Sequence, residues 1–241
     1  MIRDPEMLEQ LLETIRNFVK NELVPLEHEV EESNAIPEHI VSQMKELGLF
    51  GLTIPEEYGG LGITMEEEIL VALELGKTSA AFRSLIGTNN GIGSSGILID
   101  GTEEQKQKYL PRYASGEYIG SFCLTEPDSG SDAASLKTTA TKDGDHYILN
   151  GTKRFITNAP RATTFTVMAR TNPEIKGASG ISAFLVEAGT PGLSLGKIDK
   201  KMGQHGSYTC DVIFDHCRVH QDQLIGGQEG IGFKTAMRVL D

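Results

Sequence analysis

The chain has 241 residues, with 22 Lys and Arg against 34 Asp and Glu, which gives a formal net charge of −12. This charge disfavours nucleic acid and anionic membranes as partners, because both are bound by basic patches. No apolar run is long enough to span a bilayer, and the acidic N-terminus is not typical of a signal or transit peptide, so we expect no membrane insertion. Three cysteines, Cys123, Cys210 and Cys217, provide no even disulfide framework, which favours a reducing, cytoplasmic environment.

The first half of the chain is predicted to be helical. Apolar residues recur at helical spacing from Leu8 to Val19, and a second helix is expected to begin at Pro37 and to end at Gly48. Two predicted capping boxes mark the starts of later helices. Thr64 pairs with Glu67 at the start of a helix that is expected to run to Leu75, and Thr102 pairs with Gln105 at the start of a short helix that is expected to end before Pro111. With a further helical stretch over 80–99, the pattern predicts an all-α domain over residues 1–117.

Near Gly116 the apolar period changes from helical to two, which is typical of strands. Asp143-Gly144 and Asn150-Gly151 are hairpin signals, and strands are expected over 164–169, 181–186 and 209–214. We therefore expect an antiparallel β sandwich or barrel domain over residues 118–226, and an α+β chain overall.

The helical period returns after Gly230, where apolar residues lie on one face: Phe233, Ala236, Met237 and Leu240. The stripe ends in mid-pattern, without a Gly or Pro stop. We interpret residues 227–241 as the start of a truncated C-terminal helical domain; the alternative is a short helix docked on the β domain.

The most informative segment runs from Phe122 to Asp132, with the sequence FCLTEPDSGSD. It leaves an apolar strand through Pro127 and enters a stretch of hydroxyls and small residues. Such a stretch presents backbone N–H groups and hydroxyls to an anionic or amide-rich ligand. An ordinary strand-to-loop transition is the alternative interpretation of this segment alone.

A second segment, YILNGTKRFITN over residues 147–158, follows closely. Together the two segments resemble the acyl-CoA dehydrogenase family, in which the first segment and the aromatic-Ile-Thr triplet hold FAD. Further matches lie in PEEYGGLG over 55–62, GTEEQ over 101–105 and FDHCRV over 214–219. The resemblance covers essentially the whole chain.

The resemblance implies an oxidoreductase of fatty acid metabolism. This flavoprotein would use FAD to dehydrogenate an acyl-CoA thioester to the trans-2-enoyl-CoA and would pass electrons to an electron-transfer flavoprotein. A homotetramer or homodimer is expected. Two alternatives stay open: a related acyl-CoA oxidase-type flavoenzyme, and a non-catalytic assembly or binding fragment of this fold.

The resemblance also assigns roles to individual residues. Thr125, with the Leu124 backbone, would hydrogen-bond the pyrimidine edge of the flavin, and Thr157 would lie beside flavin N5. Phe155 would pack on the ring system, where many members have Trp; Phe keeps the stacking face and loses the indole donor. The cofactor-binding set implied is Phe122, Cys123, Leu124, Thr125, Gly130, Ser131, Phe155, Ile156 and Thr157.

Substrate contacts are implied for Ser131 and Asp241, and part of the acyl pocket for residues 88–93. No residue in 1–241 matches the family's catalytic base, so none is assigned, and an isolated 1–241 piece is expected to be inactive. Glu126 belongs to the flavin-binding loop by resemblance. No metal site is expected, because His205, Cys210 and His216 fit no paired Cys-x-x-Cys spacing.

Overall fold

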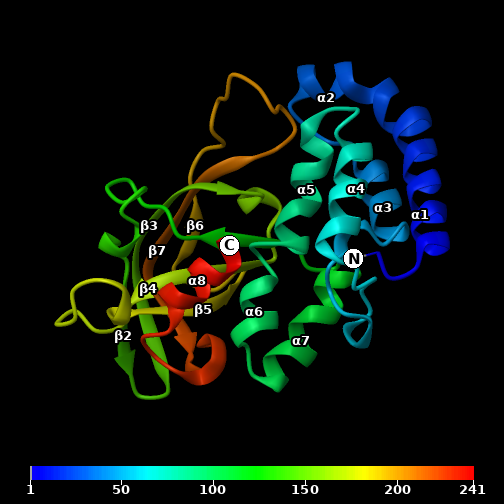
Figure 1. Ribbon diagram of the computed structural model, residues 1–241. Coiled ribbons are helices and arrows are strands. Elements are labelled where there is room, and N and C mark those ends of the chain that lie inside the picture. The colour runs from blue at the N-terminus through cyan, green and yellow to red at the C-terminus, as the bar shows by residue number, and fades with distance from the viewer. Residues whose placement is uncertain (1) are drawn as a thin grey trace.

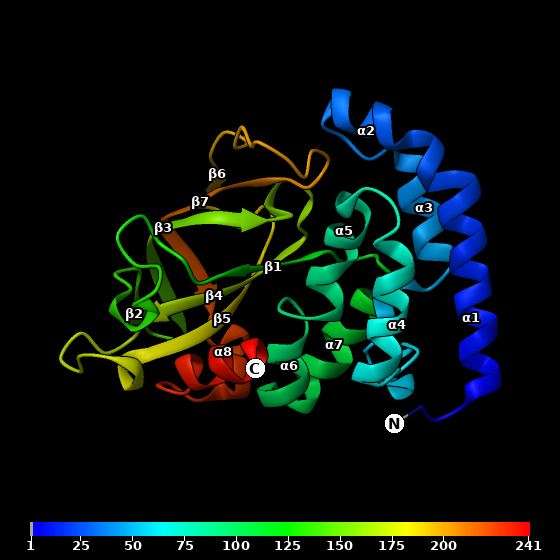
Figure 2. The ribbon, with the colours of Figure 1, turned by 45° about the horizontal axis from the view of Figure 1, so that its top comes forward.

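The computed structural model describes residues 2–241, in which a group of helices lies beside a seven-stranded sheet (Figure 1). Helices α1 to α4 lie away from the sheet, α5 contacts β1, and α6, α7 and α8 lie close to the sheet (Figure 2). The helices are α1 (Pro5–Phe18), α2 (Glu27–Ser33), α3 (Glu38–Glu46), α4 (Met65–Leu75), α5 (Ala80–Asn90), α6 (Ser95–Asp100), α7 (Glu103–Ala114) and α8 (Gly232–Leu240).

Polar caps fix the starts of several helices. The Asp4 carboxylate accepts from two backbone N–H groups at the start of α1, and both predicted capping boxes are formed, at the starts of α4 and α7. Gly48 follows α3 with φ +71°, the left-handed conformation that ends helices. The predicted starts of α4 and α7 and the predicted end of α3 are therefore confirmed, because each boundary is set by residues close to it in sequence.

Two helix predictions are wrong in detail. Helix α7 does not end before Pro111 but contains it and continues to Ala114. Proline removes one helix hydrogen bond, and the burial of Leu110 and Tyr113 around it outweighs that loss. The helical stretch expected over 80–99 is divided at Gly91 into α5 and α6.

Six strands of the sheet follow one another in the order β1-β4-β2-β3-β7-β6. The seventh strand, β5, lies outside this path and also pairs with β4. Its strands are β1 (Gly120–Cys123), β2 (Thr139–Asp143), β3 (His146–Thr157), β4 (Thr164–Arg170), β5 (Ile181–Glu187), β6 (Leu193–Leu195) and β7 (Thr209–His220). Most pairs are antiparallel, as the hairpin signals predict. The pair β1–β4 is parallel, however, and β2 also meets the end of β4 in parallel, so the sheet is mixed.

The predicted hairpin at Asn150-Gly151 is not formed. Strand β3 passes through both residues, and the tight turn lies at Gly144, between Asp143 and its partner His146. Gly151 marks a register shift opposite β7 and has φ +152°. A Cβ on Gly151 would lie 2.4 Å from Thr138 Oγ1, so this glycine permits a close backbone approach in a bulge and not a turn.

Helix α8 packs against α6 and β5, with Ala236 fully buried. Phe233, Met237 and Val239 lie against the same apolar cluster, so the apolar face is largely covered, and Leu240 remains exposed. Helix α8 thus packs on α6 and the sheet, and this packing agrees with both interpretations given above. The domain limits at residues 117 and 226 stay a prediction.

Three apolar clusters form the core. One lies among α1 to α5, and one lies within the sheet. The third joins the two parts, because it combines Tyr109 and Tyr113 of α7 with Phe122 of β1, Leu185 of β5 and Ala236 of α8. This cluster holds the end of β1 in place. Over residues 2–241, no helix has both the length and the apolar character needed to cross a bilayer.

Candidate cofactor site

The two segments singled out in the sequence meet where β1 ends beside the end of β3. The Arg154 backbone N–H donates to the Thr125 carbonyl O at 2.8 Å, and Ser121 Oγ donates to the Thr157 carbonyl O at 2.7 Å. Residues 122–125 thus lie beside residues 154–157 although they are far apart in sequence. We refer to this place as the segment junction.

Four of the predicted residues can serve the segment junction only through their backbone, because their side chains are buried in the core. Cys123 and Ile156 pack within the sheet, and Phe122 and Leu124 pack in the cluster shared with α7. Burial raises the pKa of the Cys123 thiol. A buried thiol with a raised pKa is a core residue and not a nucleophile.

Three predicted hydroxyls, by contrast, are available. Thr125 and Thr157 are half-buried and Ser131 is exposed. In the described part of the chain, residues 2–241, none of these three side-chain oxygens is hydrogen-bonded. They can therefore donate to, or accept from, a ligand without breaking an existing bond.

Phe155 projects from a bulge in β3. The register against β7 shifts between Lys153 and Ile156, and Phe155 has φ +60°, which is uncommon for a bulky residue. Its side chain is 64% exposed, and the Arg154 guanidinium lies 5.8 Å from its ring centroid. An exposed aromatic ring held by a strained bulge indicates a binding surface and not a core position.

The loop after Thr125 is closed by its own backbone. Glu126 and Ser129 exchange two backbone hydrogen bonds, of 2.9 and 3.2 Å, and Ser129 Oγ donates to the Asp132 carbonyl O. Gly130 and Ser131 lie exposed on this loop. An added Cβ on Gly130 would meet nothing within 4 Å, so the protein itself does not require glycine there.

Beneath this loop lies a buried ion pair that the sequence interpretation did not identify. Lys153 is fully buried, and its Nζ lies 2.8 Å from Glu126 Oε1 and 3.2 Å from the Leu124 carbonyl O. The Glu126 carboxylate also accepts from the backbone N–H groups of Lys137 and Thr138, at 2.6 and 2.9 Å. One carboxylate therefore joins three chain segments.

These bonds decide the state of Glu126. Burial raises the pKa of its carboxyl, but the Lys153 charge and the hydrogen bonds from Thr138 and Lys137 outweigh burial and hold the pKa below its usual range. A carboxylate with a lowered pKa and three donors is poorly suited to remove a proton from carbon. Glu126 is therefore a structural anchor.

Two cavities lie near the sheet. One, of about 500 Å³, adjoins the exposed loop and is lined by Asp132, Lys137, Arg170 and Lys176, among others. Arg170 donates to carbonyl groups on both sides of it, at Ala134 and Gly177. Because three of these four residues are cationic, the cavity suits an anionic ligand.

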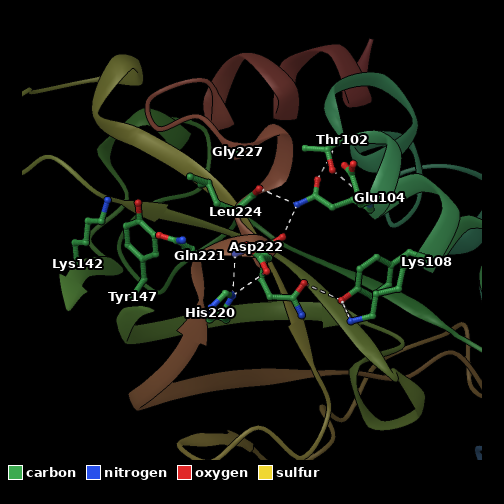
Figure 3. A pocket seen from close by; sticks show the side chains of 13 residues that line it. Thr102, Glu104, Lys108, Lys142, Tyr147, His220, Gln221, Asp222, Leu224 and Gly227 are labelled. Carbon is green, nitrogen blue, oxygen red and sulfur yellow. Dashed lines mark hydrogen bonds and ion pairs between the residues drawn. The ribbon is translucent and has the colours of Figure 1, made fainter. Parts of the chain in front are cut away.

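The larger cavity, of about 820 Å³, lies elsewhere, between α7 and residues 220–227 (Figure 3). Tyr147, at the opposite end of β3 from Phe155, lines it, and several of its polar groups pair with neighbours. Tyr109 Oη donates to Gln223, and Gln105 Nε2 donates to the Leu224 carbonyl O. No residue predicted to bind the cofactor lines this cavity.

Within residues 2–241, no hydrogen bond or ion pair links Asp241 to the segment junction. It follows α8, where its backbone N–H donates to the Met237 carbonyl O at 3.0 Å, and its side chain is exposed. Within residues 2–241, no group of three or more His, Cys, Asp or Glu side chains is arranged to hold a metal ion.

One sequence signal could have revealed Lys153. Tyr147 and Leu149 occupy alternate, inward positions of β3, and Lys153 occupies a later position of the same face. A lysine at an inward strand position requires a buried partner, and Glu126 is the first of three acidic residues in the neighbouring segment 122–132. The bulge at Phe155 has no comparable signal, because no glycine marks it.

Family models match nearly all of the chain. Residues 5–117 match the N-terminal domain of acyl-CoA dehydrogenase, and residues 121–217 match its middle domain. An acyl-CoA dehydrogenase of Bacillus subtilis is 43% identical over 94% of this chain and 59% of its own length. The chain thus spans about three fifths of the length of this curated relative.

Solved structures agree. A chain in the structure of the electron transferring flavoprotein of Acidaminococcus fermentans has a TM-score of 0.93 and 41% identity, over 100% of this chain and 63% of that one. An acyl-CoA dehydrogenase of Bacillus anthracis complexed with FAD has a TM-score of 0.87 and 36% identity, over 99% and 41%. With its fold, its paired motifs and these matches, the chain belongs to the acyl-CoA dehydrogenase family.

Proposed function

We propose that the chain forms the FAD-binding part of an enzyme that dehydrogenates an acyl-CoA thioester between its α and β carbons, to the trans-2-enoyl-CoA. The observation that carries this proposal is the segment junction, where the two unbonded hydroxyls of Thr125 and Thr157 and one exposed aromatic ring lie on two adjoining segments. The Bacillus anthracis relative, which is complexed with FAD, supports the choice of cofactor.

The residues fit FAD in two ways. Thr125 and Thr157 provide hydroxyls on opposite sides of the segment junction, which suits the donors and acceptors of a flavin ring. Phe155 provides an apolar face for the same ring. When bound, FAD would supply the redox chemistry by accepting the hydride from the β-carbon. The chain's own residues would orient the ring.

The CoA portion is proposed to lie toward Ser131 and the neighbouring cationic cavity. The Ser131 hydroxyl is exposed beside Asp132, which lines the cavity with Lys137 and Lys176. A phosphate-bearing ligand needs such a local positive site even on an acidic protein. Asp241 is kept as a proposed substrate contact, although the described contacts do not join it to this region.

The acyl chain is proposed to lie near residues 88–93. A cavity of about 380 Å³ between α4 and α5 is lined in part by Asn90, Gly91 and Ser94. Thr88 and Asn89 are buried, and both side chains bond to the protein, so they support this wall without facing a ligand freely.

An electron-transfer flavoprotein is the proposed electron acceptor, and the similarity to a chain of the Acidaminococcus fermentans structure supports it. We also propose a cytoplasmic homotetramer or homodimer. The free thiols of all three cysteines support a reducing compartment.

Flavin titration tests the proposal. FAD is added to the chain under anaerobic conditions, and bound FAD is measured by quenching of its fluorescence. We expect saturable binding that is lost in Thr125→Val/Thr157→Val, which removes both hydroxyls at nearly constant volume. Equal binding by the variant and the parent would contradict the assignment of the segment junction.

The same titration separates the alternatives. A chain that never binds FAD would be an assembly fragment of this fold. In the whole enzyme, reduction by acyl-CoA followed by reoxidation in air would identify an oxidase. Reoxidation only by an electron-transfer flavoprotein or a dye would identify a dehydrogenase.

A further inference from the structure

We propose that Lys153 and Glu126 form a positioning pair that aims the Leu124–Thr125 peptide at the cofactor. The proposal rests on the proposed FAD site and goes beyond it, because neither side chain faces the ligand. Lys153 is fully buried, and no other Lys or Arg in residues 2–241 is buried. A charge in such a place requires an explanation.

Stability does not provide that explanation. Removing two charges from water is costly, and apolar residues of similar volume in place of a buried pair are often neutral or stabilising. Breaking the pair by losing only one partner, however, leaves an uncompensated buried charge. The pair Lys153–Glu126 is therefore better explained by the geometry it imposes.

That geometry concerns one peptide plane. Lys153 Nζ donates to the Leu124 carbonyl O at 3.2 Å. In a trans peptide, the carbonyl and the following N–H point in opposite directions, so the Thr125 N–H points away from Lys153. Among residues 2–241 this N–H has no hydrogen-bond acceptor. A half-buried backbone donor without an acceptor, beside an unbonded Thr125 hydroxyl, is aimed at a ligand.

Glu126 also fixes the position of the loop over residues 126–138. Its carboxylate holds Lys153 at one side and the N–H groups of Lys137 and Thr138 at the other. The loop that carries Ser131 begins and ends at these contacts. Because Lys153 stands two residues before Phe155 on β3, one buried pair fixes the donor, the loop and the aromatic ring relative to one another.

The test compares four variants with the parent chain. Glu126→Gln and Lys153→Met each break the pair, and Glu126→Gln/Lys153→Met removes both charges at similar volume. Leu149→Ala is the matched control, because Leu149 belongs to the apolar cluster within the sheet and not to the cluster that contains Leu124. Three quantities are measured: the thermal midpoint without FAD, the FAD dissociation constant, and amide hydrogen exchange over residues 124–138.

We expect the double variant to fold with a thermal midpoint above those of both single variants, because no unpaired charge remains. Its FAD affinity should nevertheless be at least about tenfold weaker than that of the parent, the equivalent of one misplaced hydrogen-bond donor. Exchange of the Lys137 and Thr138 amides should increase. Leu149→Ala should lose stability but keep its FAD affinity and its exchange over 124–138.

A double variant that binds FAD as tightly as the parent, with the same flavin absorption spectrum, would overturn the proposal. A parent chain that binds no FAD would overturn the proposed function, and with it the aiming of the peptide. The exchange measurement would then still decide whether the pair fixes the loop, so the two failures are distinguishable.

Discussion

Phe155 combines a left-handed backbone, with φ +60°, and a side chain that is 64% exposed. The left-handed conformation costs an L-residue roughly 1–2 kcal/mol. Burial does not offset this, because the ring lies largely in solvent. We infer that the conformation is retained for the ring's position over the segment junction.

This inference predicts that Phe155→Gly weakens FAD binding while it changes stability little. Glycine relieves the left-handed strain and adds roughly 0.5–1 kcal/mol of chain entropy to be lost on folding, so the free energy of unfolding should change by less than about 1 kcal/mol. FAD affinity should fall about tenfold, because the stacking face is removed. Urea unfolding and flavin titration measure the two effects.

Phe155→Trp is the control for this experiment. It keeps an aromatic face at the same backbone position, so FAD affinity should be retained within about threefold. If Phe155→Gly binds FAD as well as Phe155→Trp does, the ring is not a flavin contact.

At the scale of elements, two glycines have different roles, one in the β2–β3 turn and one within β3. Gly144 sits in the turn with φ +61°, and an added Cβ would meet nothing within 4 Å. Gly151 sits inside β3, and an added Cβ would lie 2.4 Å from Thr138 Oγ1 and 2.8 Å from its Cα. Backbone at that distance cannot give way cheaply.

We therefore predict that Gly151→Ala destabilises the chain by at least about 2 kcal/mol, since overpacking against backbone adds to strain. Gly144→Ala should cost only about 1 kcal/mol, because it adds left-handed strain alone. Chemical denaturation of the two variants measures both values. Equal losses would mean that Thr138 can move aside.

Local sequence patterns predicted some features of the fold correctly, whereas features that depend on long-range contacts could not be predicted. Capping boxes are local, so the starts of α4 and α7 could be predicted from four residues each. Asn150-Gly151 has the composition of a tight turn, yet the contact that requires this glycine comes from Thr138, outside the dipeptide. A long-range contact of this kind is not encoded in the local pattern. The paired motifs at 122–132 and 155–157 were readable, but the bulge that exposes Phe155 was not.

His205 connects α2 to the segment before β7 through contacts of its two ring nitrogens. Its Nδ1 lies 3.1 Å from the Glu31 carbonyl O and 2.8 Å from Glu31 Oε1, and its Nε2 lies 3.0 Å from the Lys201 carbonyl O. Both ring nitrogens face acceptors, and only the protonated imidazole can donate from both. The Lys201 carbonyl, together with Glu31 and against desolvation, raises the pKa of His205 above its usual 6.5.

The sign of the pH effect follows. A raised folded-state pKa gives stability that is fully present below the unfolded pKa, near 6.5, and is lost as pH rises through the folded pKa. We predict that the free energy of unfolding contains a His205 contribution that decreases above pH 6.5. Urea unfolding of the chain and of His205→Gln between pH 5.5 and 8.5 measures it. Parallel pH profiles for the two chains would disprove this role.

For the whole molecule, buried amide side chains join the helices to the sheet. Asn158, at the end of β3, donates to the Leu85 carbonyl O of α5, and Asn89 of α5 accepts from the Gly120 N–H at the start of β1. Gln105 of α7 donates to the Leu224 carbonyl O. These bonds require fixed positions on both sides, so the segment junction is held by the helices as well as by the sheet.

The last prediction concerns catalysis by residues 1–241. A base that removes an α-proton needs a carboxylate whose pKa is raised toward neutrality. The buried carboxylates of the described range, Glu67, Glu74 and Glu126, are all hydrogen-bonded, and their pKa values are lowered by hydrogen bonds and, for Glu126, by Lys153 despite burial. We therefore expect that the chain, saturated with FAD, is not reduced by any acyl-CoA, since a missing base commonly lowers rates by ~10²–10⁴-fold.

Anaerobic bleaching of the flavin band by a panel of acyl-CoAs measures this, with dithionite as the control for a reducible flavin. One carboxylate gives a specific way to contradict the prediction. Burial raises the pKa of Glu68 against the effect of Arg83, and Glu68 lines the cavity of about 380 Å³ between α4 and α5. Bleaching by an acyl-CoA that is abolished in Glu68→Gln, with FAD affinity unchanged, would identify Glu68 as the base and show that these residues suffice for the reaction.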